Sequence, residues 1–239
     1  MSGGQHALSA AVVGLSVARV IAGRWLRRLR KLEAVYSAYV GHNDIIFEKI
    51  LSLHVPKGVV VADVTYGRGT FWKKVPQNKY KLLTSDLQTG VDCRYLPYAD
   101  NSVEAVVLDP PYMEGLYRRK HQKPITHGDF RARYSDSMPV IGGPKYHQAV
   151  LALYRDAGNE AVRVLVKTGI LIVKCQDEVS NHKQELTHVQ IINDYERRLG
   201  LSTKDLFVVV RPDFPSVGRI IKQQHARKRH SYFLVFCKK

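Results

Sequence analysis

The sequence has few cysteines, and its longest apolar stretch is interrupted by charge. The three cysteines, Cys93, Cys175 and Cys237, lie far apart and lack the pairing of a zinc site, so we expect free thiols in a reducing cytoplasm and no metal. Residues 7–21 are largely apolar but are interrupted by Arg19, and the basic cluster at residues 24–31 follows them instead of preceding them. This order argues against a signal peptide, and the interruption argues against a membrane span.

Acidic residues are scarce relative to basic ones. Among 239 residues, 21 Asp and Glu stand against 37 Lys and Arg, which gives a formal net charge of +16. Such an excess indicates a polyanionic partner. Because the basic residues are spread along the chain and do not gather on one amphipathic helix, we expect nucleic acid as this partner and not a membrane.

The composition predicts one main domain with a substantial core at residues 36–239, preceded by a basic extension at residues 1–35. Residues 25–31 have the period of a basic helix, so this extension is either a poorly ordered tail or a helix that contacts nucleic acid. Residues 113–145 are rich in Arg, Lys, His, Gly and Pro and lack apolar periodicity. We expect a long functional loop there.

Strands and helices alternate along the main domain. Helical patterns occupy residues 43–55, with Asn43 or Asp44 as the N-cap, and residues 146–166 and 188–199. Apolar runs typical of buried strands occupy residues 58–63, 81–85, 103–108, 169–174, 206–210 and 231–236. This alternation predicts an α/β fold, a mostly parallel sheet with helices on both faces and a C-terminal antiparallel hairpin.

Three of the predicted strands end in an acidic residue, Asp63, Asp86 or Asp109. Ligands of such sheets bind outside the carboxyl ends of the strands, so these carboxylates are expected to line the site. The first strand is followed directly by Gly67 and Gly69, which predict a strand, a glycine turn and then a helix.

The sharpest motif is Asp109-Pro110-Pro111-Tyr112, directly after a buried strand. The exocyclic amino nitrogen of a base is a poor nucleophile because its lone pair is delocalised into the ring. The Asp109 carboxylate and the Pro110 carbonyl can each accept a hydrogen bond from the amino group, and Tyr112 can stack on the base. The alternative is a plain turn after a strand, but its place about 40 residues after the glycine turn favours catalysis.

This chain resembles, over residues 42–239, the class I amino-methyltransferases of nucleic acids, whose motif is (Asp/Asn/Ser)-Pro-Pro-(Tyr/Phe/Trp). The resemblance implies a Rossmann-like fold, S-adenosyl-L-methionine as cofactor and the four residues Asp109 to Tyr112 as the catalytic motif. The Asp form is typical of adenine N6 enzymes more than of cytosine N4 enzymes. Tyr66 and Arg68 depart from the small residues that the family more often has in its glycine loop.

The resemblance also implies the cofactor residues. Asp86 can accept from the ribose hydroxyls, Asp92 and Cys93 stand in the segment that holds the adenine, and His42 stands in a weaker motif near the methionine carboxylate. The remaining cofactor residues belong to the first strand end and the glycine loop: Asp63, Thr65, Gly67 and Gly69. Asp92 as a simple turn residue and His42 as a surface or capping residue remain open alternatives.

Two basic segments are predicted to contact nucleic acid. They contribute Arg118, Arg119 and Lys120 from the long loop, and Arg227, Lys228 and Arg229 before the last strand. A solvated loop and a solvent-exposed hairpin are the alternatives.

The sequence thus predicts an adenine-N6 methyltransferase of double-stranded DNA, of the restriction-modification type, which flips its target base. Methylation of RNA at adenine N6 or guanine N2, and a non-catalytic nucleic-acid-binding subunit with this fold, remain alternatives. The recognition region is small, so a specificity subunit or a homodimer would be compatible with this prediction.

Overall fold

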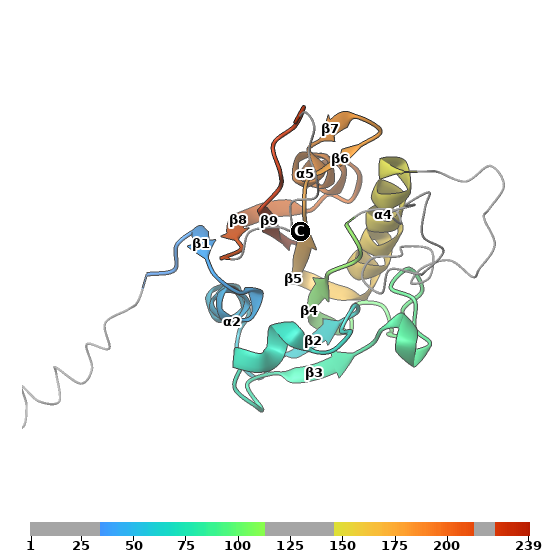
Figure 1. Cartoon of the computed structure of the whole chain (residues 1–239). Helices are drawn as coiled ribbons and strands as arrows, with labels where there is room; N and C mark the ends of the chain where they lie inside the picture. Colours follow the sequence, from blue (N-terminus) through green and yellow to red (C-terminus); the bar gives the residue numbers. More distant parts are fainter. Residues whose placement is uncertain (1–33, 113–145, 213–222) are drawn as a thin grey trace, which may run out of the picture. The chain divides into compact units, whose positions relative to one another are not determined.

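The computed structural model describes residues 34–112, 146–212 and 223–239, and its centre is a seven-stranded sheet (Figure 1). The strands are β1 (Ala38–Val40), β2 (Val60–Asp63), β3 (Lys81–Thr84), β4 (Val103–Leu108), β5 (Leu165–Cys175), β8 (Ser202–Val210) and β9 (His230–Cys237). The expectations for residues 1–33 and for the loop at 113–145 lie outside the described residues.

The sheet has the order β1-β8-β9-β5-β4-β2-β3, and β9 is the one strand that runs against the others in it. The chain passes from β2 outward to β3 and then returns to β4 on the other side of β2. The strand order therefore reverses between β2 and β4, and ligands of open α/β sheets bind at the carboxyl ends of the strands on either side of such a reversal.

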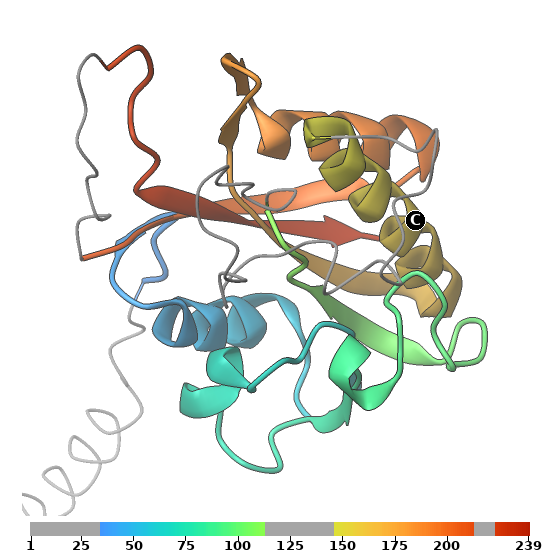
Figure 2. The ribbon, with the colours of Figure 1, turned by 45° about the vertical axis from the view of Figure 1, so that its right-hand side comes forward.

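Helices cover both faces of the sheet (Figure 2). On one face lies α2 (Asn43–His54), whose Phe47 ring is 6.1 Å from the Phe233 ring of β9. On the other face lie α4 (His147–Val164) and α5 (Thr187–Arg198), and Tyr195 of α5 is 5.3 Å from Phe236 of β9. These ring contacts on opposite sides of β9 confirm the predicted layers.

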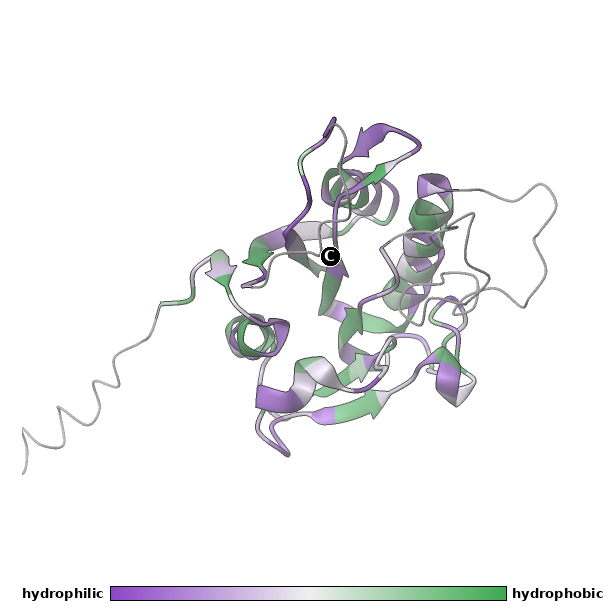
Figure 3. Ribbon diagram, in the orientation of Figure 1, coloured by the Kyte–Doolittle hydropathy of each residue, from purple (hydrophilic) through white to green (hydrophobic). Residues whose placement is uncertain are grey.

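The central strands are apolar because both of their faces are covered. In β4 every residue but Glu104 is buried, and the second half of β5 is buried throughout. Figure 3 shows these two strands as mostly hydrophobic. Parallel strands buried on both sides lack the polar alternation of a half-exposed sheet, which is why the sequence shows them as continuous apolar runs.

The α/β fold, the mostly parallel sheet and the C-terminal antiparallel pair of β8 and β9 are confirmed. The strand predicted as buried at residues 81–85 is β3, which lies exposed at the edge of the sheet. Three further details differ from the prediction. The N-cap of α2 is His42, without a side-chain hydrogen bond, and not Asn43 or Asp44. The glycine turn leads into a five-residue 3-10 helix, η1 (Thr70–Lys74), and not into a long helix.

The third of these details is that short strands escaped the prediction. These are β1 and a hairpin of β6 (Glu178–Ser180) and β7 (Lys183–Glu185). The two turn residues of the hairpin, Asn181 and His182, both have positive φ. Such turns usually have the sequence Asn-Gly, and the histidine in the second position hid this hairpin from the sequence analysis. Within the described residues, no helix has the length and apolarity needed to cross a bilayer.

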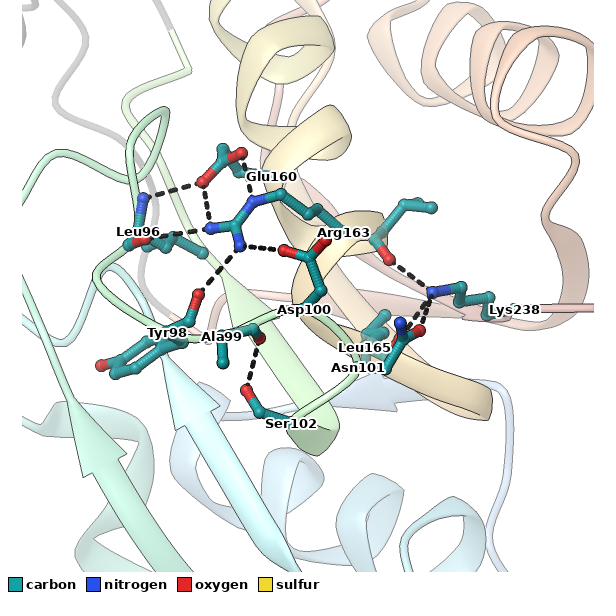
Figure 4. A network of polar contacts seen from close by, with 11 residues as sticks. Leu96, Tyr98, Ala99, Asp100, Asn101, Ser102, Glu160, Arg163, Leu165 and Lys238 are labelled. Carbon is teal, nitrogen blue, oxygen red and sulfur yellow. Dashed lines mark hydrogen bonds and ion pairs between the residues drawn. The ribbon is translucent and has the colours of Figure 1, made fainter.

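The segment between β3 and β4 contains no strand, and Arg163 of α4 fixes its backbone (Figure 4). The guanidinium donates to the carbonyls of Leu96 (3.0 Å) and Tyr98 (2.9 Å) and to Asp100 (2.6 Å). It also donates twice to Glu160, which in turn accepts from the Leu96 N–H at 2.9 Å. These hydrogen bonds satisfy backbone groups that a neighbouring strand would otherwise pair.

Replacing Arg163 with Met should lower the free energy of unfolding by about 1 to 3 kcal/mol, because several charge-assisted hydrogen bonds are lost together. Urea denaturation measures this loss. Arg155 on the same helix is 57% exposed, with its Nε 3.7 Å from Asp194, so Arg155→Met should change the stability by less than about 0.5 kcal/mol. Equal effects of the two variants would contradict a fixing role of Arg163.

Candidate active site

The Asp-Pro-Pro-Tyr motif begins immediately after β4, at the reversal of strand order. The Asp109 N–H donates to the Thr65 hydroxyl at 2.6 Å, and Thr65 follows the neighbouring strand β2. The phenol of Tyr112 donates a short hydrogen bond to Asp109 Oδ1, which closes the motif into a turn. Pro110 is buried and Pro111 is half-buried. The four predicted catalytic residues therefore form one rigid turn beside the end of β2.

The glycine loop that follows β2 has the backbone conformation that its glycines predict. Gly67 and Gly69 have φ of +54° and +63°, in the left-handed region that side chains disfavour. A Cβ on Gly69 would collide with the Tyr66 phenol, which packs directly against this glycine. Among the described residues, the Thr65 carbonyl, 4.0 Å away, is the one neighbour that a Cβ on Gly67 would meet. The backbone at Gly67 is therefore open to a ligand.

Asp63, at the end of β2, is 3% exposed, and its side chain contacts the glycine loop. Its carboxylate accepts from the Thr65 N–H at 3.1 Å and from the Trp72 indole at 2.7 Å. Burial raises the pKa of Asp63 to about 7, against the two hydrogen bonds that lower it, and the nearby charges of Asp109 and Asp86 raise it further. In this structure Asp63 shapes the loop through its own contacts.

Asp86 follows β3 and reaches the same loop. Its Oδ2 accepts from the Gly67 N–H at 3.1 Å, and its Oδ1 accepts from Gln88 at 3.0 Å. The half-buried carboxylate thus lies at the carboxyl end of the third adjacent strand, as predicted for a residue that binds a ribose.

The other predicted cofactor residues are more dispersed. Asp92 accepts from the Arg94 N–H at 2.8 Å and from its guanidinium at 2.6 Å, and the Cys93 thiol is buried in the core. His42 is exposed, next to the end of β1, on the carboxyl edge of the sheet but on the far side of β8 and β9 from the motif. The structure therefore gathers Thr65, Gly67 and Asp86 around the motif and leaves His42 apart.

The structure adds a residue that the sequence analysis missed, Lys174, near the end of β5. It is 1% exposed, and its ammonium donates a short hydrogen bond to the Ser231 hydroxyl. The same nitrogen lies 4.7 Å from the centre of the Phe233 ring and 6.0 Å from that of Tyr112. Burial lowers the pKa of Lys174 to about 8, while the negative charge of Asp109 opposes this shift. A charged residue at the end of an otherwise apolar run was the available signal.

The basic segment before β9 also lies on this edge, because β9 runs against the other strands and starts where they end. Arg227 is exposed, and Lys228 and Arg229 are half-buried. The Arg229 guanidinium donates to the Arg211 carbonyl at 2.8 Å and to the Pro212 carbonyl. Arg118, Arg119 and Lys120 lie outside the described residues.

These groups fit S-adenosyl-L-methionine better than a metal ion. The open backbone at Gly67 and the Asp86 carboxylate beside it suit a ligand with hydroxyl groups that needs close backbone approach. In the part of the chain that the structure describes, no group of three or more His, Cys, Asp or Glu is arranged to hold a metal.

No protein-family model and no curated protein matches this sequence. Among solved structures, TrmN from Thermus thermophilus matches with TM-score 0.46 and 14% identity, over 87% of this chain and 51% of its own. A second Thermus thermophilus protein, provisionally named a DNA modification methylase and complexed with S-adenosyl-L-methionine, matches with TM-score 0.39 and 19% identity, over 75% and 56%.

The 1,6-didemethyltoxoflavin-N1-methyltransferase of Burkholderia thailandensis matches with TM-score 0.44 and 12% identity, over 100% of this chain and 92% of its own. The chain spans about half the length of TrmN. At these identities and TM-scores the likenesses carry no argument about activity, so the proposed function rests on the residues of this chain.

The raised pKa of Asp63 makes stability depend on pH. The pKa rises from 3.8 to about 7 on folding, so the folded state favours the protonated carboxyl. The stabilisation is complete below about pH 4 and is lost as the pH rises through about 7. The free energy of unfolding of the wild type minus that of Asp63→Asn should therefore fall over this range, by about 4 kcal/mol at most. Urea denaturation at several pH values tests this, and a difference independent of pH would contradict it.

Proposed function

We propose that this protein transfers a methyl group from S-adenosyl-L-methionine to an exocyclic amino group of a nucleic-acid base, with adenine N6 in DNA as the leading substrate. The observation that carries the proposal is the joining of two strand ends at the reversal of strand order. There the Asp109 N–H and the Thr65 hydroxyl hold the Asp-Pro-Pro-Tyr turn against the glycine loop.

The cofactor would be held by the ends of β2 and β3 and would supply an electrophilic methyl group. Asp86 would accept hydrogen bonds from the ribose, and the backbone at Gly67 would hold the methionine part. Asp63 keeps the loop in shape through Thr65 and Trp72. Asp92 and the backbone at Cys93 remain the proposed contacts of the adenine ring, and His42 that of the methionine carboxylate.

At the acceptor side, the chain orients the amino group and favours its reaction. The Asp109 carboxylate accepts a hydrogen bond from one amino N–H, the Pro110 carbonyl accepts one from the other, and both stabilise the positive charge that develops on nitrogen. The nitrogen releases one proton to water once the methyl group is attached. Tyr112 fixes the plane of the base by stacking. Its phenol also donates to Asp109 Oδ1, which links the ring to the carboxylate. Holding the reacting groups in place in this way accounts for a large part of such a rate enhancement.

The nucleic acid would approach the carboxyl edge of the sheet. Arg227, Lys228 and Arg229 border this edge, and Arg118, Arg119 and Lys120 follow the Asp-Pro-Pro-Tyr motif in sequence. The excess of positive charge, +16 overall, would attract a phosphate backbone. A flipped base is required because an amino group inside a duplex cannot reach the turn.

Exchanging Asp109 or Asp86 for Ala should separate turnover from cofactor binding. Asp109→Ala should lose about 100- to 1,000-fold in rate, since one preorganised polar contact to the amino group is gone, and should bind the cofactor nearly normally. Asp86→Ala should weaken cofactor binding by about 1.5 to 3 kcal/mol. Calorimetry and transfer of radiolabelled methyl to DNA and RNA measure the two effects.

Asp156→Ala provides the control, because Asp156 is exposed on α4 and belongs to neither set of contacts. Mass spectrometry of the digested nucleic acid then identifies the product. N6-methyldeoxyadenosine would support the proposal, whereas N2-methylguanosine from RNA would show that guanine in RNA is the substrate instead. Wild-type turnover by Asp109→Ala would show that Asp109 is not part of the active site.

The affinity for DNA should fall steeply with salt, and removing Arg227 and Lys228 together should flatten this dependence. Each phosphate that a basic side chain neutralises contributes about 0.9 to the slope of log affinity against log salt. The matched control is the double variant Lys57→Ala and Lys81→Ala, which removes the same charge at the opposite edge, where β2 and β3 begin. The same slope in both double variants would show that DNA does not follow the edge bearing Arg227.

A further inference from the structure

The buried position of Lys174 is unfavourable for the stability of the fold. Its side chain is almost completely buried, and the Ser231 hydroxyl is the one hydrogen-bond acceptor that the described residues provide for its ammonium group. A buried charge with few acceptors usually lowers stability, and an apolar side chain of similar size in its place is often neutral or better. The fold therefore gives no reason for a lysine at this position.

The surroundings of Lys174 point to the catalytic turn. Lys174 and Phe233 are paired across β5 and β9, and the ammonium lies over the Phe233 ring at 4.7 Å. Ser231, two residues earlier on β9, fixes the nitrogen from the same side. From this position the ammonium faces the Tyr112 ring at 6.0 Å and interacts with the charge of Asp109.

Among the residues that the structure describes, few other ionisable groups act on this lysine. They are Asp109 and Tyr112 from the turn after β4, Cys175 on β5 and Arg211 after β8. From β9 it meets the neutral Ser231 and Phe233, and Phe233 packs in turn on Phe47 of α2 and Phe71 of η1. Asp109 is the acidic group among them, so it is the natural partner of the ammonium charge.

We propose that Lys174, held by Ser231, is a positioning residue that keeps the Asp109 carboxylate ionised and the Tyr112 ring in place for the acceptor base. This inference rests on the proposed function. Asp63, Asp86 and Asp109 lie close enough together for their charges to repel. The Lys174 cation is buried 6.0 Å from the centre of the ring whose phenol donates to Asp109. It offsets that repulsion, and the attraction that favours the protonated lysine equally favours the ionised carboxylate. A cation beside the Tyr112 ring is attracted to that ring as well.

The first arm of the test needs no substrate. In protein with labelled lysine, nuclear magnetic resonance should find Lys174 titrating near pH 8. In Asp109→Asn its pKa should fall, because the nearby negative charge that favours the ammonium is gone. An unchanged titration of Lys174 in Asp109→Asn would overturn the pairing.

The second arm uses the pH dependence of methyl transfer. Lys174→Met should fold, because it exchanges a buried cation for an apolar side chain of similar length. The acid limb of its kcat/KM profile should move up by about one pH unit, so that its activity on that limb is about tenfold lower relative to its own plateau. Ser231→Ala should move the limb in the same direction by less. A purely structural lysine would leave the limb where it is, and that result would overturn the proposal.

Lys79→Met is the matched control. Lys79 is also nearly buried, with 10% of its side chain exposed, but it pairs with Glu48 at 2.7 Å, away from the catalytic turn. Its replacement should leave the acid limb unchanged. A wild-type protein that methylates no nucleic acid would refute the proposed function, and the lysine titration would then decide the pairing with Asp109 by itself.

Discussion

The hydrogen bond from the Asp109 N–H to the Thr65 hydroxyl is the contact on which the candidate site depends. It joins the ends of β2 and β4, the two strands between which the chain changes its direction across the sheet. A turn that carries an acceptor for an amino group and a loop that can hold a cofactor must be positioned within a fraction of an ångström of each other for transfer. Here the register of two paired, buried strands sets that distance, and the hydrogen bond fixes it.

Burial decides how strongly the ionisable side chains at the carboxyl edge of the sheet act on one another. Three carboxylates end adjacent strands, and one of them, Asp63, is so well shielded from water that its pKa rises to about 7. A chain with net charge +16 could offset them with surface arginines, but charges in water are screened and act weakly. Lys174 is inside the fold, where an opposite charge acts strongly. For the charge balance of the three carboxylates, the buried position of Lys174 therefore matters more than the net charge of the chain.

Much of this could be predicted from the sequence, because buried parallel strands appear as apolar runs and an acidic residue after each marks the carboxyl edge. What escaped depends on tertiary contacts. Lys174 interrupts an apolar run, and only the pairing of β5 with β9 reveals that Ser231 and Phe233 surround it. The short η1 has a local cause instead. Val75 precedes a proline and takes an extended conformation, which ends the helix.

The shortness of η1 has a consequence for the site. A long helix after the glycine loop would bring a dipole to bear on the cofactor, whereas a helix of five residues contributes little. The loop is instead fixed by side chains, since Trp72 and Thr65 donate to Asp63 and Gly67 donates to Asp86. At the opposite edge of the sheet, where β4 and β5 begin, Arg163 fixes the strandless segment before β4 in the same manner. In both places, individual polar contacts order a segment that a long helix or a neighbouring strand would otherwise order. The proposed cofactor affinity therefore depends on single residues such as Asp86.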